Sequence, residues 1–433
     1  MPRHLAQKLD GTILDMELTL DATVHELRAA VANRLELPIM FVALALHGVA
    51  CLESQTLVEA SAGIYQVLIW VTPALSILHH DDVDEKIQAL LGLAKVGHLA
   101  GASAINLIVK HFFAREATVR HLAKEAMIGI GGKCTSLCID LRITLDNGNS
   151  ERIKVLPNIV GHLASLSSLN LDLEVLQRDS ANHELFQTRV LEHLGTCFPT
   201  DLANLTSLGF IWHGVIDGQG AKHLGKGLGN LTKLECLQLE LNTKRNGSPL
   251  GDENAQYLGE GIGMLRNLTA LQLNLSMCLR NSDTTCFQYF CNGISQLTRL
   301  TSLNVNLHSV GLDHEGTRCF SECLQNLVHL TSMELDFAQD RDSPMDGIGN
   351  EGAQHLGECI GKLEQLKSLQ LHLHENQIGD TGAAHLCQAL RRLTQLASLS
   401  VYLFNNEMGD EAKQLVSACR TLVRARKRSL SGN

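Results

Sequence analysis

Apolar and polar residues alternate with a period of two in short segments that recur along most of the chain. The segment "LKSLQLHL", which begins at Leu366, is typical, because its later leucines occupy every second position. Such alternation predicts a half-buried β-strand. The segment "GDTGAAHLCQAL", from Gly379, then places apolar residues at helical spacing after a glycine-rich break. This part of the chain therefore predicts one strand followed by one helix.

The strand-like segment occurs nine times, at spacings of 29 to 39 residues. Its aligned copies begin at Cys134, Leu166, Leu205, Leu234, Leu268, Leu300, Leu330, Leu366 and Leu396. The helical segment recurs as well, for example as "GQGAKHLGKGLG" and "GNEGAQHLGECI". In these units a glycine allows the chain to turn from strand to helix, and a nearby Asp or Asn is expected to cap the first amides of the helix.

One strand and one helix cannot bury their apolar sides alone, so consecutive units are expected to stack. Stacked strands lie about 4.8 Å apart, whereas packed helices need about 8–10 Å. The array is therefore predicted to curve, with the strands on the inner wall and the helices outside. The predicted fold class is an α/β solenoid shaped like a horseshoe, with a parallel inner sheet.

The repeated unit resembles the leucine-rich repeats of the ribonuclease-inhibitor type, which are also found in NOD-like receptors. The resemblance runs from about Cys134 to Cys419. Asn376 and Asn406 occupy the position of the family's buried asparagine in the last two units. Earlier units carry other residues there: Leu176, Lys244, Cys278 and Val310.

The first part of the chain has a different pattern. The segment "TILDMELTL" alternates as a strand, "DATVHELRAAVANRLELP" reads as a capped amphipathic helix, and "MFVALALHG" and "YQVLIWVTP" read as further strands. This order resembles ubiquitin-like (β-grasp) domains, and the resemblance implies docking to ubiquitin-pathway or proteasome proteins. The segment ends in "VTP" rather than Gly-Gly, so conjugation to a lysine is not expected.

Residue by residue, the docking patch of ubiquitin falls near Ala45, His47 and Leu68. Trp70 is expected on the same side of its strand as Leu68, where it would add contact area. The alternative is that Trp70 packs against the following domain.

Between these modules, the sequence predicts three short helices. The phrase "ATVRHLAKEAMIGIG" resembles the second helix of a HEAT or armadillo repeat. Such a segment is expected to cap the apolar end of the solenoid rather than to bind a partner of its own. The predicted organisation is a ubiquitin-like domain over 1–73, a helical cap over 74–132, and about nine repeats with a basic tail over 133–433.

Charge and cysteine content narrow the class of protein. The formal net charge is −10, which argues against a general nucleic-acid binder, since such proteins use a basic excess to neutralise phosphates. The 13 cysteines show no disulfide framework or set of zinc ligands and are expected to be reduced. No run approaches the ~18 apolar residues of a membrane span. We expect a cytoplasmic protein, with a nuclear location as the alternative.

Few residues suggest chemistry. There is no phosphate-binding P-loop and no His-Glu-x-x-His zinc helix. His223, His355 and His385 recur at one helix position, but stacked helices at ~8–10 Å hold them too far apart for one Zn²⁺. His372 and His374 share a strand face without an evident third metal ligand. We therefore expect no catalytic residue, no metal site and no cofactor.

Thiol chemistry is not expected either. A cysteine nucleophile needs a positioned base and a reason for a low thiol pKa. Cys359, Cys387 and Cys419 fall at apolar helix positions, which is typical of inert core thiols.

The residues between the buried leucines of each strand are expected to face the inner wall. Over the nine units these residues include six acids and one arginine, Arg142. A wall of this kind would attract a basic protein partner, with the acids steering association and two aromatic residues as the anchor. The predicted partner-binding residues are Asp140, Asp172, Glu174, Glu240, Asn274, Asn306, Glu334, Asp336, His372, Tyr402 and Phe404. The alternative is a merely solvated face.

The function that the sequence favours is a non-enzymatic scaffold or recognition protein that binds a protein partner on the inner wall. It would also act as an adaptor if Leu68 and Trp70 bind ubiquitin-pathway proteins. The alternative is a regulator of a small GTPase, because Ran GTPase-activating proteins carry similar repeats. Such a regulator needs an exposed arginine on a repeat loop, and the candidates are Arg142, Arg245, Arg280 and Arg341.

The C-terminal segment "RTLVRARKRSLS" reverses the sign of the charge. Cations near the end of a helix are favourable on dipole grounds, which is the reading that we prefer. The alternatives are a nuclear-import or anionic-surface patch, or a phosphorylation site at Ser429.

Overall fold

The structure is a computed structural model of the whole chain. It describes residues 3–7, 13–17, 24–38, 40, 42–46, 49–50, 65–69, 76–78, 82–96, 108, 111, 116–131, 136–145, 166–177, 183–242, 250–276, 279, 284–341 and 347–431. The chain divides into two compact units. One comprises Met1–Leu137 with His162–Ser165, and the other Cys138–Gly161 with Leu166–Asn433.

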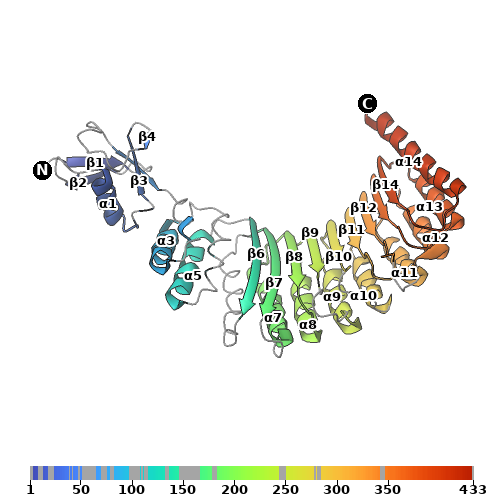
Figure 1. The fold of residues 1–433 in the computed structure, drawn as a ribbon, viewed down its shortest axis with the longest axis horizontal. Helices are drawn as coiled ribbons and strands as arrows, with labels where there is room; N and C mark the ends of the chain where they lie inside the picture. The colour runs from blue at the N-terminus through green and yellow to red at the C-terminus, as the bar shows by residue number, and fades with distance from the viewer. Residues whose placement is uncertain are drawn as a thin grey trace. The chain divides into compact units, whose positions relative to one another are not determined.

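The second unit contains a sheet of nine strands that lie side by side in the order of the sequence, from β6 to β14 (Figure 1). Strands β7 to β14 pair in parallel throughout. The nine strands are β6 (Ser136–Leu145), β7 (Ser168–Gln177), β8 (Ser207–His213), β9 (Cys236–Leu241), β10 (Ala270–Asn274), β11 (Ser302–Asn306), β12 (Ser332–Asp336), β13 (Ser368–His372) and β14 (Ser398–Tyr402).

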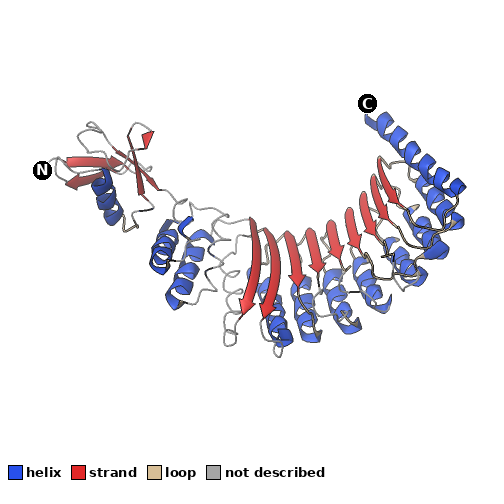
Figure 2. Ribbon diagram, viewed as in Figure 1, coloured by secondary structure: helices blue, strands red, loops and turns tan. Residues whose placement is uncertain are grey.

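One helix follows each strand from β7 onward, and these helices cover one side of the sheet (Figure 2). The strands line the inner, concave side of this unit and the helices its outer side, as the predicted solenoid requires. The helices are α7 (His183–Asp201), α8 (Gly218–Gly229), α9 (Asp252–Gly263), α10 (Thr284–Ile294), α11 (His314–Leu324), α12 (Gly349–Ile360), α13 (Asp380–Arg392) and α14 (Asp410–Ser431).

The alternation seen in the sequence determines which side of each strand is buried. In β11, β12 and β13 the second and fourth residues are buried, and the others are half-buried on the open side. The buried side chains, mostly leucine, pack against apolar positions of the helices, such as Leu356 and Leu386. This continuous core stacks from unit to unit, so each repeat is stabilised by its neighbours.

Asparagine side chains link the last repeats at the turns that follow the strands. Asn376 is fully buried, and its Nδ2 donates to the carbonyls of Phe337 and His374 at 2.8 and 3.0 Å. Its Oδ1 accepts from the amide of Ile348 at 3.2 Å. Asn406 does the same one unit later: its Oδ1 accepts from the amides of Asn376 and Ile378. The prediction of buried asparagines here is confirmed for Asn376, whereas Asn406 is half-buried.

Helix capping agrees with the sequence in some units and differs in others. Asp217 and Asp313 accept hydrogen bonds from amides in the first turns of α8 and α11, at 2.7 and 2.8 Å. In α13 the residue before the helix is a glycine, and the cap comes from the preceding repeat. Asn350 Oδ1 accepts from the amides of Gly379 and Gly382 at 2.9 and 2.8 Å. These bonds tie adjacent repeats together, besides satisfying the helix end.

The glycine-rich segments of α8 and α9 bring neighbouring helices into backbone contact. A Cβ on Gly261 would lie 2.2 Å from the carbonyl oxygen of Gly225, and one on Gly227 would lie 2.6 Å from the Cα of Gly195. The glycines therefore allow close helix packing between consecutive repeats.

The first unit contains a separate five-stranded sheet with strand order β2-β1-β5-β3-β4. The β1–β5 pair is parallel, and the β1–β2, β3–β5 and β3–β4 pairs are antiparallel. Its elements are β1 (Arg3–Gln7), β2 (Ile13–Glu17), α1 (Val24–Arg34), β3 (Val42–Leu46), β4 (Val49–Ala50) and β5 (Tyr65–Ile69). Leu27 and Val31 on the helix and Val42 on the sheet are fully buried.

Two further helices of this unit, α3 (Val83–Val96) and α5 (Ala117–Gly131), pack against each other. The third predicted helix falls between them, largely outside the described residues. None of the helices in the described part of the chain combines the length and apolar character needed to cross a membrane.

Candidate functional site on the concave face

The parallel register aligns equivalent residues of β7–β14 in rows on the concave face, which we name by their position from the first residue of each strand. The third-position row is Asn170, Gly209, Gln238, Gln272, Asn304, Glu334, Gln370 and Ser400. The fifth-position row is Asp172, Ile211, Glu240, Asn274, Asn306, Asp336, His372 and Tyr402. The seventh-position row is Glu174, His213, Asn242, Ser276, His308, Ala338, His374 and Phe404.

Ten of the predicted partner-binding residues lie in these three rows. The eleventh, Asp140, belongs to β6, and its side chain lies outside the described residues. The rows contain five carboxylates and, among their described residues, no Lys or Arg. The ten residues are Asp172, Glu174, Glu240, Asn274, Asn306, Glu334, Asp336, His372, Tyr402 and Phe404.

Side-chain amides hold two of these carboxylates, Glu334 and Glu240, in place. Glu334 accepts one hydrogen bond from Asn304 at 2.8 Å and one from Gln370 at 2.9 Å, so three adjacent strands share it. Glu240 accepts from Asn242 at 2.8 Å. Amide donors orient a carboxylate without cancelling its charge, so these groups leave the concave face negative.

The fifth-position residues of three central strands have a structural role that the sequence did not reveal. Asn306 Oδ1 and Asp336 Oδ1 each accept from the backbone amide two residues later, at 2.9 and 3.1 Å, and Asn274 Oδ1 does so at 3.2 Å. This local bond turns the chain out of the strand, as Asx turns do. One side-chain oxygen of each of these residues therefore already accepts a hydrogen bond from the backbone, which supports the turn.

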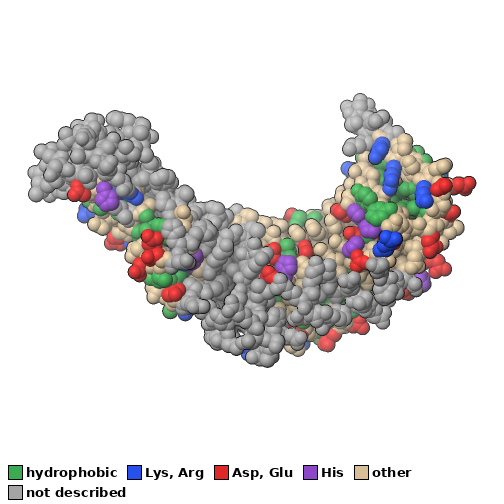
Figure 3. All heavy atoms as spheres, in the orientation of Figure 1, with side chains coloured by type: hydrophobic (Ala, Val, Ile, Leu, Met, Phe, Trp, Pro, Cys, Tyr) green, Lys and Arg blue, Asp and Glu red, His purple; other side chains and the backbone are tan. Residues whose placement is uncertain are grey.

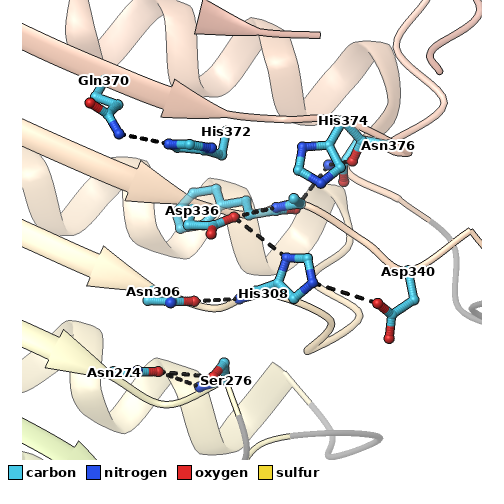
Figure 4. Close-up of polar contacts among 12 residues, drawn as sticks. Asn274, Ser276, Asn306, His308, Asp336, Asp340, Gln370, His372, His374 and Asn376 are labelled. Atoms are coloured by element: carbon cyan, nitrogen blue, oxygen red, sulfur yellow. Dashed lines mark hydrogen bonds and ion pairs between the residues drawn. The ribbon is translucent and has the colours of Figure 1, made fainter. Parts of the chain in front are cut away.

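A group of histidines and carboxylates lies where β11, β12 and β13 end (Figure 4). His308 Nδ1 is 3.7 Å from Asp336 Oδ1, and His308 Nε2 is 3.5 Å from Asp340 Oδ1. The rings of His308 and His374 come within 6.0 Å, although two strand spacings separate them. The residue between them in the seventh-position row is Ala338, which is small enough to let both rings lean over it.

Two exposed aromatic rings extend this group to the last strand. Tyr402 is 40% exposed and stacks on His372 with a centroid distance of 4.5 Å. Phe404 is 56% exposed and stacks on His374 at 4.3 Å. Figure 3 shows hydrophobic and histidine side chains gathered near the C-terminal end of this unit. The Lys and Arg side chains that it shows nearby come from outside the three rows.

The environment of His374 favours its neutral form. Burial lowers the pKa of its imidazole, and this effect outweighs the nearby carboxylate of Asp336, which acts in the opposite direction. Its Nδ1 is buried and has no hydrogen-bond partner among the described residues. A protonated ring would leave an additional buried donor without a partner, which is unfavourable.

The arrangement does not form a nucleophile with a positioned base. Both ring nitrogens of His308 face carboxylates, and the hydroxyl of Ser276 donates to Asn274 Oδ1 at 2.9 Å. Within the described residues no group of three His, Cys, Asp or Glu side chains is arranged to hold a metal ion. His223, His355 and His385 lie on α8, α12 and α13, on the side of the sheet opposite to the three rows.

Nine of the described cysteines are reduced, and seven of these are buried in the helical layer. Burial raises the pKa of the Cys359 and Cys387 thiols to about 12 each, so their thiolates are scarcely populated at neutral pH. Cys419 donates to the carbonyl of Cys387. Cys236, by contrast, is exposed at the first position of β9.

In the first unit, the register places Ala43 opposite Leu68 and Ala45 opposite Gln66, so Ala45 and Leu68 are on the same face of adjacent strands. His47 and Trp70, which complete the predicted surface, lie outside the described residues.

The sequence did not identify three residues of the concave group: His213, His308 and Asp340. His213 Nε2 lies 3.0 Å from Asp172 Oδ1. His213 and His308 stand at the seventh position of their strands, so following the alternation two residues further would have found them. Asp340 comes from the turn after β12, and no periodicity indicates its position.

Comparisons with known proteins assign no family to the chain. No family model matches it, and no curated protein matches it. Among solved structures, it is similar to a computationally designed protein based on the template of human erythrocytic ubiquitin. That match has 27% identity and covers 16% of this chain and 92% of the designed protein, with a TM-score of 0.15. The function of the chain is therefore inferred from its own geometry.

Proposed function

We propose that the chain is a non-enzymatic scaffold that binds a basic protein partner on the concave face of its repeat unit. The observation that carries this proposal is the set of carboxylates in the three rows, with no described Lys or Arg among them, next to two exposed aromatic rings. Carboxylates would draw a cationic partner toward the face, and the rings of Tyr402 and Phe404 would provide the apolar contact that slows its release.

The carboxylates suit steering because they lie on the concave side of the sheet and are only partly exposed. The side chain of Asp336 is 25% exposed and that of Asp172 is 41% exposed. Charges on a low-dielectric concave surface produce a stronger field than charges on a convex one, and such fields raise association rates by ~10–10³-fold. A ring already stacked on a histidine loses little further conformational freedom when a partner covers it.

The repeats themselves support a leucine-rich-repeat solenoid of the ribonuclease-inhibitor type. A strand and a helix alternate at a spacing of about 30 residues, leucines fill the inner layer, and Asn376 and Asn406 bond to the backbone between repeats. We propose this family on those features, together with the boundaries 1–73, 74–132 and 133–433 for the three modules. Proteins of this architecture expose a wide concave surface, which fits a binding role.

We also propose that the first module is ubiquitin-like and makes the chain an adaptor. Its support is the mixed sheet with the order β2-β1-β5-β3-β4, a central parallel pair and one helix packed on the sheet. Leu68 would belong to the surface that binds ubiquitin-pathway proteins. The concave face and this surface would then connect two partners.

The alternative is a regulator of a small GTPase. It is favoured only by the presence of an exposed arginine, Arg341, beside Asp340 on the turn after β12. The side chain of Arg142 and the residues Arg245 and Arg280 lie outside the described residues. If this alternative held, replacement of the catalytic arginine among these four candidates by Ala would abolish stimulated GTP hydrolysis, and Arg341 is the first to test.

The proposal is tested by affinity purification with mass spectrometry on three baits. These are the intact chain, the chain carrying Glu334→Lys with Asp336→Lys, and a chain that starts at Ala74. Basic partners are expected to be lost from the charge-reversed bait only. Ubiquitin-pathway proteins are expected to be lost from the shortened bait only. Identical partner sets for all three baits would contradict both roles.

The matched control reverses two exposed glutamates on the outer helices, Glu260→Lys with Glu358→Lys. Each accepts a hydrogen bond from the glutamine four residues earlier, so the charge change is the same but lies on the opposite side of the sheet. This variant is expected to retain the partners of the wild-type chain.

A further inference from the structure

A groove runs across the amino-terminal ends of six strands, β7 to β12, beside the carboxylates of the three rows. Its volume is about 440 Å³. It is lined by the first three residues of these strands, so it follows the third-position row rather than the acidic and aromatic residues further along. It therefore extends the candidate site toward the amino-terminal ends of the strands.

The lining of this groove is part polar and part apolar, with leucines at the second position of five strands, and it is almost uncharged. Small side chains, mostly serine, occupy the first position of each strand, and side-chain amides occupy the third position in four of the six strands. Glu334 is its single carboxylate among the described lining residues. The amides belong to Asn170, Gln238, Gln272 and Asn304.

Three of these amides have unused hydrogen-bonding capacity. Gln238 and Gln272 make no side-chain hydrogen bond to another described residue. Asn170 Oδ1 also has no partner among the described residues, but it is buried beneath the surface of the groove. Asn304 uses Nδ2 for its bond to Glu334, which leaves its Oδ1. Between Asn170 and Gln238 the row contains Gly209, where a Cβ would lie only 2.7 Å from Asn170 Oδ1. The glycine therefore gives the asparagine side chain its space.

A side-chain amide has one acceptor and two donors, so it can pair with a peptide group of any sequence. The main-chain groups of a folded domain are already paired in its own helices and sheets. An extended segment, by contrast, presents free N–H and C=O groups along both of its edges. The side-chain amides of the groove therefore offer hydrogen-bond partners to the unpaired N–H and C=O groups of an extended main chain.

We propose that the basic partner enters this groove as an extended, unfolded segment whose main chain pairs with the amides of Gln238, Gln272 and Asn304. This inference rests on the proposed function, because the charges beside the groove select the same basic partner. Five strand spacings of ~4.8 Å make the groove about 24 Å long, which accommodates about seven extended residues. Side chains of Lys or Arg in that segment reach the fifth-position carboxylates, about 7 Å further along the strands.

The test uses the full chain and a display library of random linear peptides of twelve residues. Binders are selected on the wild-type chain alone. Their affinities are then measured for a Gln238→Leu and Gln272→Leu variant, which removes the two amides at similar side-chain size. A selected peptide is then synthesised in three forms: unmodified, N-methylated on every odd-numbered residue, and N-methylated on every even-numbered residue. N-methylation removes main-chain donors and leaves the charge unchanged.

We expect enrichment of peptides with several Lys or Arg residues. In fluorescence polarisation, one of the two N-methylated peptides should bind the wild-type chain at least tenfold more weakly than the unmodified peptide. The Gln238→Leu and Gln272→Leu variant should likewise bind the unmodified peptide at least tenfold more weakly. The control variant Gln288→Leu with Gln388→Leu changes two exposed glutamines on α10 and α13 and should bind as the wild type does. Thermal unfolding of each variant checks that the fold is retained.

The other outcomes separate this inference from the proposed function. Basic peptides could bind the wild type but not the Glu334→Lys and Asp336→Lys variant, while neither N-methylation nor the two leucine substitutions weakens binding. In that case recognition of the main chain is wrong, and the proposal of a basic partner is retained. If only folded basic proteins bind, the extended segment is also wrong. If the charge reversal also leaves the affinity for the peptides unchanged, the proposed function is contradicted too.

Discussion

Substitution of Gly261 by alanine tests whether backbone contact between helices holds the repeats together. A Cβ at this position in α9 would lie 2.2 Å from the oxygen, 2.7 Å from the carbon and 2.8 Å from the Cα of Gly225 in α8. All three atoms belong to the backbone, so no side-chain rotation can relieve the contact. Ordinary contacts of a carbon atom lie near ~3.5 Å, so the helices would have to separate by about 1 Å.

Two opposing effects determine the magnitude. Alanine is favoured over glycine inside a helix by about 1 kcal/mol. Over-packing a close contact costs about 1–3 kcal/mol, and occasionally more. We expect the cost near or above the upper end, because Gly259 on the same helix already meets the backbone of the next helix, where its Cβ would lie 2.3 Å from the carbonyl of Tyr289. The net expectation is a loss of about 2 kcal/mol or more.

Urea unfolding followed by circular dichroism measures the effect as a shift of the transition midpoint. The matched control is Gly218→Ala in the first turn of α8, where the nearest atom would be 3.6 Å away. This control should be as stable as the wild type or slightly more stable. If Gly261→Ala were as stable as Gly218→Ala, the close packing of these helices would not be what requires glycine.

Three further perturbations probe the asparagines that link the last repeats (Asn376 and Asn406), the half-buried His374 and the thiols. Replacing Asn376 by Ala should lower the free energy of unfolding by about 3 kcal/mol, because two carbonyls and one amide lose their buried partner. Urea titration measures this change, and a loss below about 0.5 kcal/mol would contradict a stabilising role for the asparagine. Since burial lowers the pKa of folded His374 below the unfolded value of about 6.5, the unfolded chain binds more protons, and stability should fall as pH falls below that value. His374→Gln should flatten this pH dependence, and an unchanged slope would refute the reasoning. Among the described cysteines, a maleimide should modify Cys236 first in peptide mapping, whereas Cys359 and Cys387 should react only after unfolding; their early modification would show that the helical layer opens.

The sequence predicts the solenoid well because its information is local and repeated. The period-two and helical segments each appear many times, so an error in one unit is corrected by the others. Strands β6 to β14 coincide with the nine predicted segments, and α8 coincides with the quoted segment "GQGAKHLGKGLG". The alternation also places Glu334 and Tyr402 on the face where the structure has them.

The finer arrangement depends on contacts between repeats, which no single unit encodes. His308 approaches His374 only because a small residue, Ala338, stands between them across two strand spacings. Asn350 caps a helix of the following repeat because α13 begins after a glycine. Likewise, the unused amides of the groove become visible only when the bonding partners of each glutamine are known.

The most direct test of capture on the concave face measures how fast a recovered basic partner associates with the chain. Stopped-flow rates are compared for the wild type, for Glu334→Lys with Asp336→Lys, and for the control on the outer helices. At an ionic strength of about 0.02 M, we expect the concave charge reversal to slow association at least tenfold, and the difference to shrink at about 0.5 M. Equal rates for the wild type and the charge-reversed chain at low salt would contradict capture on the concave face.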